Sequence, residues 1–177
     1  EPIKVIKKMK QTDNFKFDEA NVMNELVYRN LSEDAKRQIC AWKYGGEYDL
    51  YNLPAYEEMQ VRQIGFMNPQ REKNYYGFWD ESILVGFVNI LEEKEEVFIG
   101  IGVNPDLCNK HYGQRMLLIA YEISKKLYPN KPLYLEVRTW NTRAVKCYQK
   151  AGFRIDGQAY ELTTGIGTGT FYRMIRE

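Results

Sequence analysis

The sequence contains little of what metal centres and disulfide-rich folds require. Among its 177 residues there is one histidine, His111, and there are three cysteines. Cys40, Cys108 and Cys147 are odd in number and widely spaced, which fits neither a disulfide framework nor a zinc knuckle. We therefore expect no metal site, and we expect reduced thiols in a cytoplasmic protein.

Strong charge of one sign and long apolar runs are also missing. The 25 Lys and Arg residues nearly balance the 24 Asp and Glu residues, for a net charge of +1. Such a balance produces no strong field that would attract nucleic acid or a membrane surface. No apolar run approaches the roughly 20 residues that cross a bilayer. We expect neither nucleic acid nor a membrane among the partners.

The pattern of the chain predicts one domain over residues 25–177. Residues 1–24 are lysine-rich and weakly patterned, and they fit either an N-terminal extension or a first strand around Ile3–Ile6. Beyond them, strand-like runs alternate with helical runs. We expect helices at 32–42, 56–63, 113–127 and 141–151, and strands at 25–31, 75–79, 83–91, 97–103, 133–137, 171–175 and from 152 onward.

This order indicates an α/β (α+β) fold with one mixed sheet and helices on both faces. Ser32 is a good N-cap for the first helix, because its side chain can accept from a free backbone N–H group. In the third helix, Met116, Ile119, Ala120, Ile123 and Leu127 share one face, which we expect to be buried. The stretch TTGIGTGT (163–170) is predicted to be a flexible turn at a hairpin tip.

The segment VNPDLCNKHYGQRML (103–117) joins a strand to an amphipathic helix that begins near Gly113. The first N–H groups of a helix have no intrahelical partner and favour phosphate groups. Gly113 would let a ligand approach the backbone, and Lys110 and Arg115 would add positive charge. The alternative is a helix start that binds only water.

Two segments resemble the GNAT acetyltransferase superfamily, and the resemblance extends over residues 25–177. In the loop, Gly113 matches the last glycine of the family's pyrophosphate motif, whereas Cys108 replaces its usual Arg or Gln and His111 replaces a glycine. The segment 133–153 is similar to the ribosomal-protein N-terminal alanine acetyltransferase branch. It matches at Leu135, Glu136, Val137, Asn141, Ala144, Tyr148, Lys150, Gly152 and Phe153.

The resemblance implies a GNAT fold that binds acetyl-CoA. Its sheet is mostly antiparallel, but strands 97–103 and 133–137 (the family's fourth and fifth) run parallel and splay apart to admit the pantetheine arm. Read without the resemblance, the GIG of the first strand is either a bulge or a tight strand, and Asn141 is a helix N-cap. The implied cofactor contacts are Ile101, Val103, Cys108, Asn109, Lys110, His111, Tyr112, Gly113, Gln114 and Asn141.

Two residues receive catalytic roles from the resemblance. Tyr148 would protonate the departing CoA thiolate, and it lies two helical turns after Asn141 on the same face. The alternative is a core tyrosine. Glu136 would be the general base, with Glu96 as the second candidate. Alternatively, Glu136 is a solvated carboxylate or an ion-pair partner of Arg138 or Lys146. Cys147 next to Tyr148 is interpreted as a packing residue and not as a nucleophile.

The acceptor is expected to meet the aromatic loop AWKYGGEYDLYNLP (41–54). Tyr44, Tyr48 and Tyr51 alternate with Glu47 and Asp49, and this combination suits a cationic amine. The alternative is that the rings pack the helices onto the sheet.

The predicted function is therefore acetyl-CoA-dependent transfer of an acetyl group to a primary amine, either a small molecule or a peptide N-terminus, by direct attack in a ternary complex. The alternative is a non-catalytic acyl-CoA-binding regulatory module of the same fold. A homodimer is compatible with either.

Overall fold

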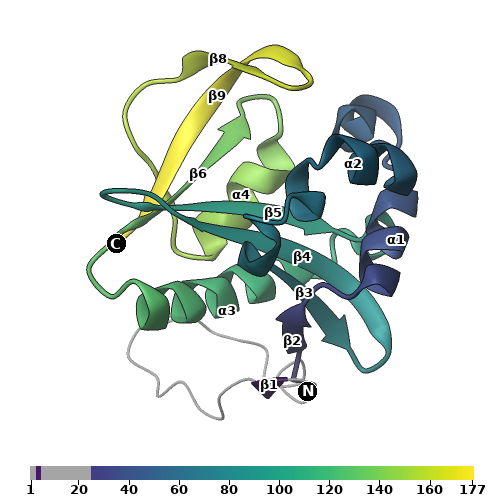
Figure 1. The fold of residues 1–177 in the computed structure, drawn as a ribbon. Helices are drawn as coiled ribbons and strands as arrows, with labels where there is room; N and C mark the ends of the chain where they lie inside the picture. Colours follow the sequence, from purple (N-terminus) through teal and green to yellow (C-terminus); the bar gives the residue numbers. More distant parts are fainter. Residues whose placement is uncertain (1–2, 5–24) are drawn as a thin grey trace.

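The computed structural model describes residues 3–4 and 25–177, which form a nine-stranded sheet flanked by helices (Figure 1). The strands follow the order β1-β2-β3-β4-β5-β6-β9-β7, with β8 paired to β9. All pairs are antiparallel except β5 with β6. Their bounds are β1 Ile3–Lys4, β2 Val27–Asn30, β3 Tyr75–Asp80, β4 Ile83–Glu92, β5 Val97–Val103, β6 Leu133–Arg138, β7 Arg154–Ile155, β8 Tyr160–Thr164 and β9 Gly167–Arg176.

The four predicted α-helices are present close to their expected bounds. Ser32 caps the first helix, since its hydroxyl accepts from the backbone N–H of Ala35 at 3.1 Å. None of the helices among the described residues is long and apolar enough to span a membrane. The helices are α1 Glu33–Ala41, α2 Tyr56–Arg62, α3 Tyr112–Leu127 and α4 Thr142–Lys150, with 3₁₀ turns η2 Gly46–Tyr51, η3 Gly65–Met67, η4 Glu72–Asn74 and η5 Pro105–Leu107.

Two hydrophobic clusters cover the two faces of the sheet, as the mixed-sheet prediction requires. On one face, Met116, Leu117 and Ala120 of α3 are fully buried against strands β4 to β6. On the other face, Ile39 of α1 and Met59 of α2 pack with side chains of β3 and β4. Figure 1 shows α3 below the sheet, with α1 and α2 grouped at its other side. The sheet therefore has a separate helical layer on each face.

The parallel strands β5 and β6 separate after one short contact. Only Val97↔Leu133 and Phe98↔Tyr134 are paired. The Val97 N–H donates to Pro132 at 2.9 Å on the β6 side, whereas the Asn104 N–H donates to Val85 of β4 at 2.9 Å.

Alternate residues of a strand direct their peptide groups to the same side. Ile99, Ile101 and Val103 therefore present their backbone edge to the gap between β5 and β6. The predicted splay is confirmed.

Two details of the sequence prediction are wrong, and one open alternative is resolved. TTGIGTGT lies at the tip of the β8–β9 hairpin as predicted, but most of it is strand and not flexible turn: Thr163 pairs with Thr168 and Thr164 with Gly167, so the turn is only Gly165–Ile166. Threonine favours strands, and this preference dominates over the glycines. Of the two alternatives for the GIG of β5, a bulge or a tight strand, the bulge is absent, because the β4–β5 register runs without a shift. Leu127, at the end of α3, is 51% exposed. Of the strand expected at 3–6, Ile3–Lys4 forms β1, and the rest lies outside the described residues.

Candidate active site

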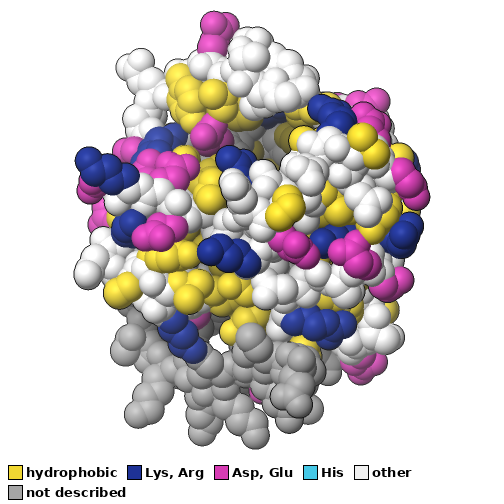
Figure 2. All heavy atoms as spheres, in the orientation of Figure 1, with side chains coloured by type: hydrophobic (Ala, Val, Ile, Leu, Met, Phe, Trp, Pro, Cys, Tyr) yellow, Lys and Arg dark blue, Asp and Glu magenta, His cyan; other side chains and the backbone are white. Residues whose placement is uncertain are grey.

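A cavity of about 660 Å³ opens at the gap between β5 and β6. Figure 2 shows a hollow between the β8–β9 end of the molecule and the part that carries α1 and α2. Lys110 alone among the predicted site residues lies outside the cavity wall; its side chain is exposed. The cavity is lined by the other predicted residues, namely Tyr44, Tyr48, Tyr51, Ile101, Val103, Cys108, Asn109, His111, Tyr112, Gly113, Gln114, Glu136, Asn141 and Tyr148.

The start of α3 presents backbone donors to this cavity. Its N-cap residue, His111, makes no side-chain capping hydrogen bond, in contrast to Ser32 at α1 and Asn141 at α4. The first three N–H groups, those of residues 112–114, have no partner within the helix. An anion at this position would complete their hydrogen bonding and would be favoured by the helix dipole.

His111 adopts the backbone conformation for which glycine is best suited. Its φ of 63° and ψ of 11° lie in the left-handed region, and Asn109 also has φ 63°. This region is accessible to L-residues at a modest cost. The histidine at this position therefore adopts a backbone conformation that a glycine would adopt without cost.

The packing of α3 against its neighbours favours a glycine at position 113, as does the close approach of a ligand to the backbone there. A Cβ atom at this position would lie 3.1 Å from the sulfur of Cys147 and 3.5 Å from Val103. Gly113 therefore lies in close contact with Cys147 of α4. Burial raises the pKa of the Cys147 thiol, which keeps it neutral and fits a packing residue better than a nucleophile.

Tyr148 projects from α4 into the cavity. Within the described part of the chain its hydroxyl forms no hydrogen bond. Burial raises the pKa of Tyr148 well above its usual value, and the neighbouring Cys147 and Tyr51 add to the effect. A phenol that stays protonated and is free to donate has the properties of a general acid.

Glu136 lines the cavity from the middle of β6. Its side chain makes no ion pair with any described residue, so the alternative of pairing with Arg138 or Lys146 is not observed. Its neighbour is Tyr160 of β8. Burial, the charge of Glu136 and a hydrogen bond with this carboxylate raise the pKa of Tyr160 to about 12.

Glu96, the second base candidate, is occupied elsewhere. Its carboxylate accepts from Arg173 at 3.1 Å and forms a second, shorter contact with the same guanidinium. Arg173 also contacts Asp156 at 3.3 Å. Glu96 does not line the cavity. Of the two carboxylates, only Glu136 is placed to receive a proton there.

The three tyrosines of the aromatic loop form one wall of the cavity and are themselves held in place. The Tyr44 hydroxyl donates to the Val103 carbonyl at 2.6 Å, and its backbone N–H donates to Asn52 at 2.6 Å. The rings of Tyr48 and Tyr51 lie 5.7 and 6.2 Å from that of Trp140. The rings therefore pack against neighbouring residues and also line the cavity, and their contact with an acceptor stays a prediction.

Asn141 connects this wall to α4. Its Oδ1 accepts from the Ala144 N–H at 3.2 Å, which is the N-cap bond. Its Nδ2 donates to the Tyr51 hydroxyl at 3.2 Å. The N-cap interpretation is confirmed, and the amide also fixes an aromatic residue of the facing wall.

Residues 36–153 match the Acetyltransferase (GNAT) family. The chain belongs to the GNAT acetyltransferases. This match covers the diverging strands, the start of α3 and nearly all of the cavity wall. No curated protein matches the sequence.

Solved structures of GNAT proteins share the fold. A GNAT acetyltransferase from Bacillus anthracis superposes with a TM-score of 0.66 at 16% identity, covering 85% of this chain and 93% of its own. A spermidine N-acetyltransferase from Vibrio cholerae, in complex with CoA and spermine, gives 0.67 at 18% identity, covering 85% and 94%. A GNAT acetyltransferase from Streptococcus pneumoniae gives 0.63 at 24% identity, covering 86% and 98%.

The charged wall of this GNAT site was not predicted as a binding feature. Four cationic side chains line the cavity beside the single carboxylate of Glu136, and they are Arg138, Arg143, Lys146 and Lys150. Three of them are three or four residues apart on α4, so they share a helix face. That spacing was visible in the sequence. Arg138 carries no such signal, because only the strand register places it.

Proposed function

We propose that this protein transfers the acetyl group of acetyl-CoA to a primary amine by direct attack in a ternary complex. One observation carries the proposal. The gap between β5 and β6 brings the carboxylate of Glu136, the protonated phenol of Tyr148 and the uncapped start of α3 into one cavity. An acyl transfer without a covalent intermediate needs a base, an acid and a donor site.

The donor side is built mainly from backbone. The N–H groups of residues 112–114 suit the pyrophosphate of CoA, and Lys146 and Lys150 add positive charge along the same wall. The open edge of β5 at Ile101 can pair with the amides of the pantetheine arm, in the manner of an added strand. The Val103 carbonyl already accepts from Tyr44, so Val103 offers its N–H.

The chemical step then requires two proton movements. Glu136 takes a proton from the ammonium form of the acceptor, and the neutral amine nitrogen attacks the thioester carbonyl carbon. As the tetrahedral intermediate collapses, the C–S bond breaks and its electron pair stays on sulfur. Tyr148 gives its proton to that sulfur, and the nitrogen loses its second proton, which restores the Tyr148 phenol. The products are a neutral amide and the CoA thiol. Holding both substrates in one cavity contributes about 7–11 kcal/mol in favourable cases.

The finer assignment of the branch rests on residues 133–153. Their likeness to the ribosomal-protein N-terminal alanine acetyltransferases supports Glu136 as the base. The regulatory-module alternative depended on Cys108 and His111, and no observation favours it, because His111 has the φ of 63° that suits the glycine it replaces.

Calorimetric titration of acetyl-CoA, followed by thiol release with a panel of amines, tests the proposal. We expect affinity in about the micromolar range, equivalent to roughly 8 kcal/mol. Gln114→Glu places a negative charge at the start of α3, where it strengthens the helix but repels a phosphate. This variant should bind acetyl-CoA about tenfold more weakly or worse.

Gln149→Glu is the matched control, since it makes the same change of charge on the exposed side of α4, outside the cavity wall. Its affinity should equal that of the parent protein. Glu136→Gln should lower kcat/KM and remove its pH dependence on the acidic side. Equal affinities of the two glutamate variants, or no binding of any acyl-CoA, would contradict the proposed donor site.

A further inference from the structure

Arg138, the last residue of β6, is a buried cation without an anionic partner. The residue is only 8% exposed, yet its side chain lines the cavity. Among the described residues, no hydrogen bond or ion pair engages its guanidinium, which lies 4.8 Å from the centre of the Phe171 ring. A buried charge is costly unless it is paired. An arginine in this situation is prepared for a ligand.

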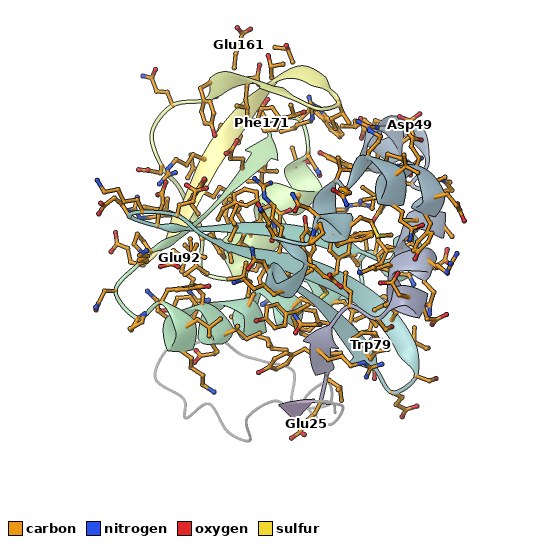
Figure 3. The ribbon with its side chains drawn as sticks, in the orientation of Figure 1. Glu25, Asp49, Trp79, Glu92, Glu161 and Phe171 are labelled. Carbon is orange, nitrogen blue, oxygen red and sulfur yellow. The ribbon has the colours of Figure 1, made fainter. Side chains whose placement is uncertain are left out.

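The fold makes room for this guanidinium. A Cβ atom at Gly169 of β9 would lie 2.1 Å from Nη1 of Arg138. Any side chain at position 169 would therefore displace the guanidinium. Phe171, two residues further along β9, pairs directly with Arg138 across the strands and is labelled in Figure 3. Gly169 and Phe171 therefore form the surface of β9 on which the arginine lies.

Arg138 and Glu136 lie on the same face of β6, because residues two apart in a strand point the same way. The intervening Val137 belongs to the core on the α3 face. Successive residues of one strand face are about 6.6 Å apart. The proposed base and a free cation are therefore neighbours on the acceptor side of the sheet.

The charges of the cavity do not suit a polycation. Among the described residues that line it, Glu136 is the only carboxylate, and four side chains are cationic. Glu47 and Asp49, which we expected near the acceptor, are exposed and outside the wall. Figure 3 shows Asp49 on the side of the molecule that carries α2. Lys146 and Lys150 serve the proposed donor site, so on β6 a linear polyamine would meet the single anion of Glu136 next to the like charge of Arg138.

We propose that Arg138 binds a carboxylate of the acceptor, so that the acceptor is an amino acid: a small amine with a carboxylate a few bonds away. This inference rests on the proposed function. The planar guanidinium can donate two parallel hydrogen bonds to a carboxylate. Glu136 then receives the proton of the neighbouring amine. The separation of the two side chains on β6 selects an acceptor in which both groups are close together.

Matched pairs of acceptors test the proposal directly. Each pair consists of an amino acid and the amine that its decarboxylation would produce, such as tyrosine with tyramine, histidine with histamine, and lysine with cadaverine. Thiol release from acetyl-CoA gives kcat/KM for each member. We expect the parent protein to prefer the amino acid by about 10- to 100-fold, the worth of a hydrogen-bonded ion contact. Equal rates within pairs, or faster reaction of the decarboxylated amines, would overturn the inference.

Variants assign the preference to Arg138. Arg138→Met keeps the length of the side chain and should abolish the preference, lowering kcat/KM for the amino acid while the decarboxylated amine changes less than about threefold. Gly169→Ala should reduce the preference with the arginine still present, because the guanidinium is displaced. Arg62→Met, on the exposed face of α2 and outside the cavity wall, is the control and should behave like the parent.

The outcomes separate this inference from the proposed function. If amines that lack a carboxylate react as fast as the matching amino acids, the proposed role of Arg138 is wrong, whereas the proposed acetyltransferase activity stands. An equal loss for both members of a pair in Arg138→Met would mean that the residue acts on structure alone, and would also refute the inference. No thiol release with any amine and no binding of acetyl-CoA would refute both. Thermal unfolding of each variant verifies the fold, and the comparison in the parent protein stands without any variant.

Discussion

Replacing Tyr148 with phenylalanine isolates one hydroxyl group in the proposed mechanism. The hydroxyl has no hydrogen-bonding partner among the described residues, so its removal leaves no unsatisfied group behind. We expect the free energy of unfolding to change by less than about 1 kcal/mol. The variant therefore separates catalysis from stability.

The effect on catalysis should be large and confined to the chemical step. Loss of a general acid lowers kcat by about 10²- to 10³-fold, which corresponds to roughly 3–4 kcal/mol of transition-state stabilisation. The hydroxyl assists only when negative charge develops on the sulfur, so the KM for acetyl-CoA should be nearly unchanged. Single-turnover thiol release at saturating acetyl-CoA measures this step without product release.

The pH profile provides a second readout. Because burial disfavours the phenolate, the pKa of Tyr148 lies above its usual value of about 10. The acid therefore stays protonated below about pH 10, and its ionisation should cause no alkaline decline of kcat in that range. Tyr28→Phe, outside the cavity wall, is the control and should retain full activity. An unchanged kcat in Tyr148→Phe would remove this residue from the mechanism.

Three further outcomes follow from local geometry. His111→Gly should retain or gain up to about 1 kcal/mol of stability, whereas His111→Val, β-branched at φ 63°, should lose about 1–2 kcal/mol, as urea unfolding would measure. Gly113→Ala should be more favourable by about 1 kcal/mol in a Cys147→Ala background than in the parent, because the contact at 3.1 Å to the sulfur is then relieved; additive effects in the double-mutant cycle would contradict this. The hydrogen bond from buried Lys36 holds the pKa of Glu33 below its usual value, so this carboxylate stabilises the fold above about pH 4.3 and the contribution is lost as the pH falls through the lowered pKa. Lys36→Met should flatten that part of the acid-unfolding curve, and an identical acid profile in both proteins would exclude the contact as its source.

Local patterns predicted the parts of this protein that depend on local physics. Ser32 and Asn141 cap their helices as their side-chain chemistry requires. The separation of Asn141 from Tyr148 by two helical turns places both on the cavity wall. The error at TTGIGTGT has a local cause too, since glycine marks turns but threonine favours strands, and the composition alone did not decide between them.

Other features depend on residues far apart in the sequence. Glu96 is a poor base because Arg173, 77 positions later, binds it. Tyr44 donates to a carbonyl 59 positions later. The position of the Arg138 guanidinium depends on the missing side chain at Gly169 of β9. The hydrophobic periodicity of the sequence does not show which strand positions must lack a side chain. Such properties follow from strand register, and the sequence specifies them only through the complete fold.

The aromatic loop is fastened to both sides of the opening between the diverging strands. Tyr44 bonds to the end of β5 at 2.6 Å, and Tyr51 accepts from Asn141 at the start of α4 at 3.2 Å. The segment thus connects the two sides of the opening, and its length sets the distance between them. A loop exchanged to change acceptor preference would shift both anchor points, so the affinity for the acyl donor would change with it. A change of acceptor specificity in this protein therefore requires paired substitutions that restore the distance between the two anchor points.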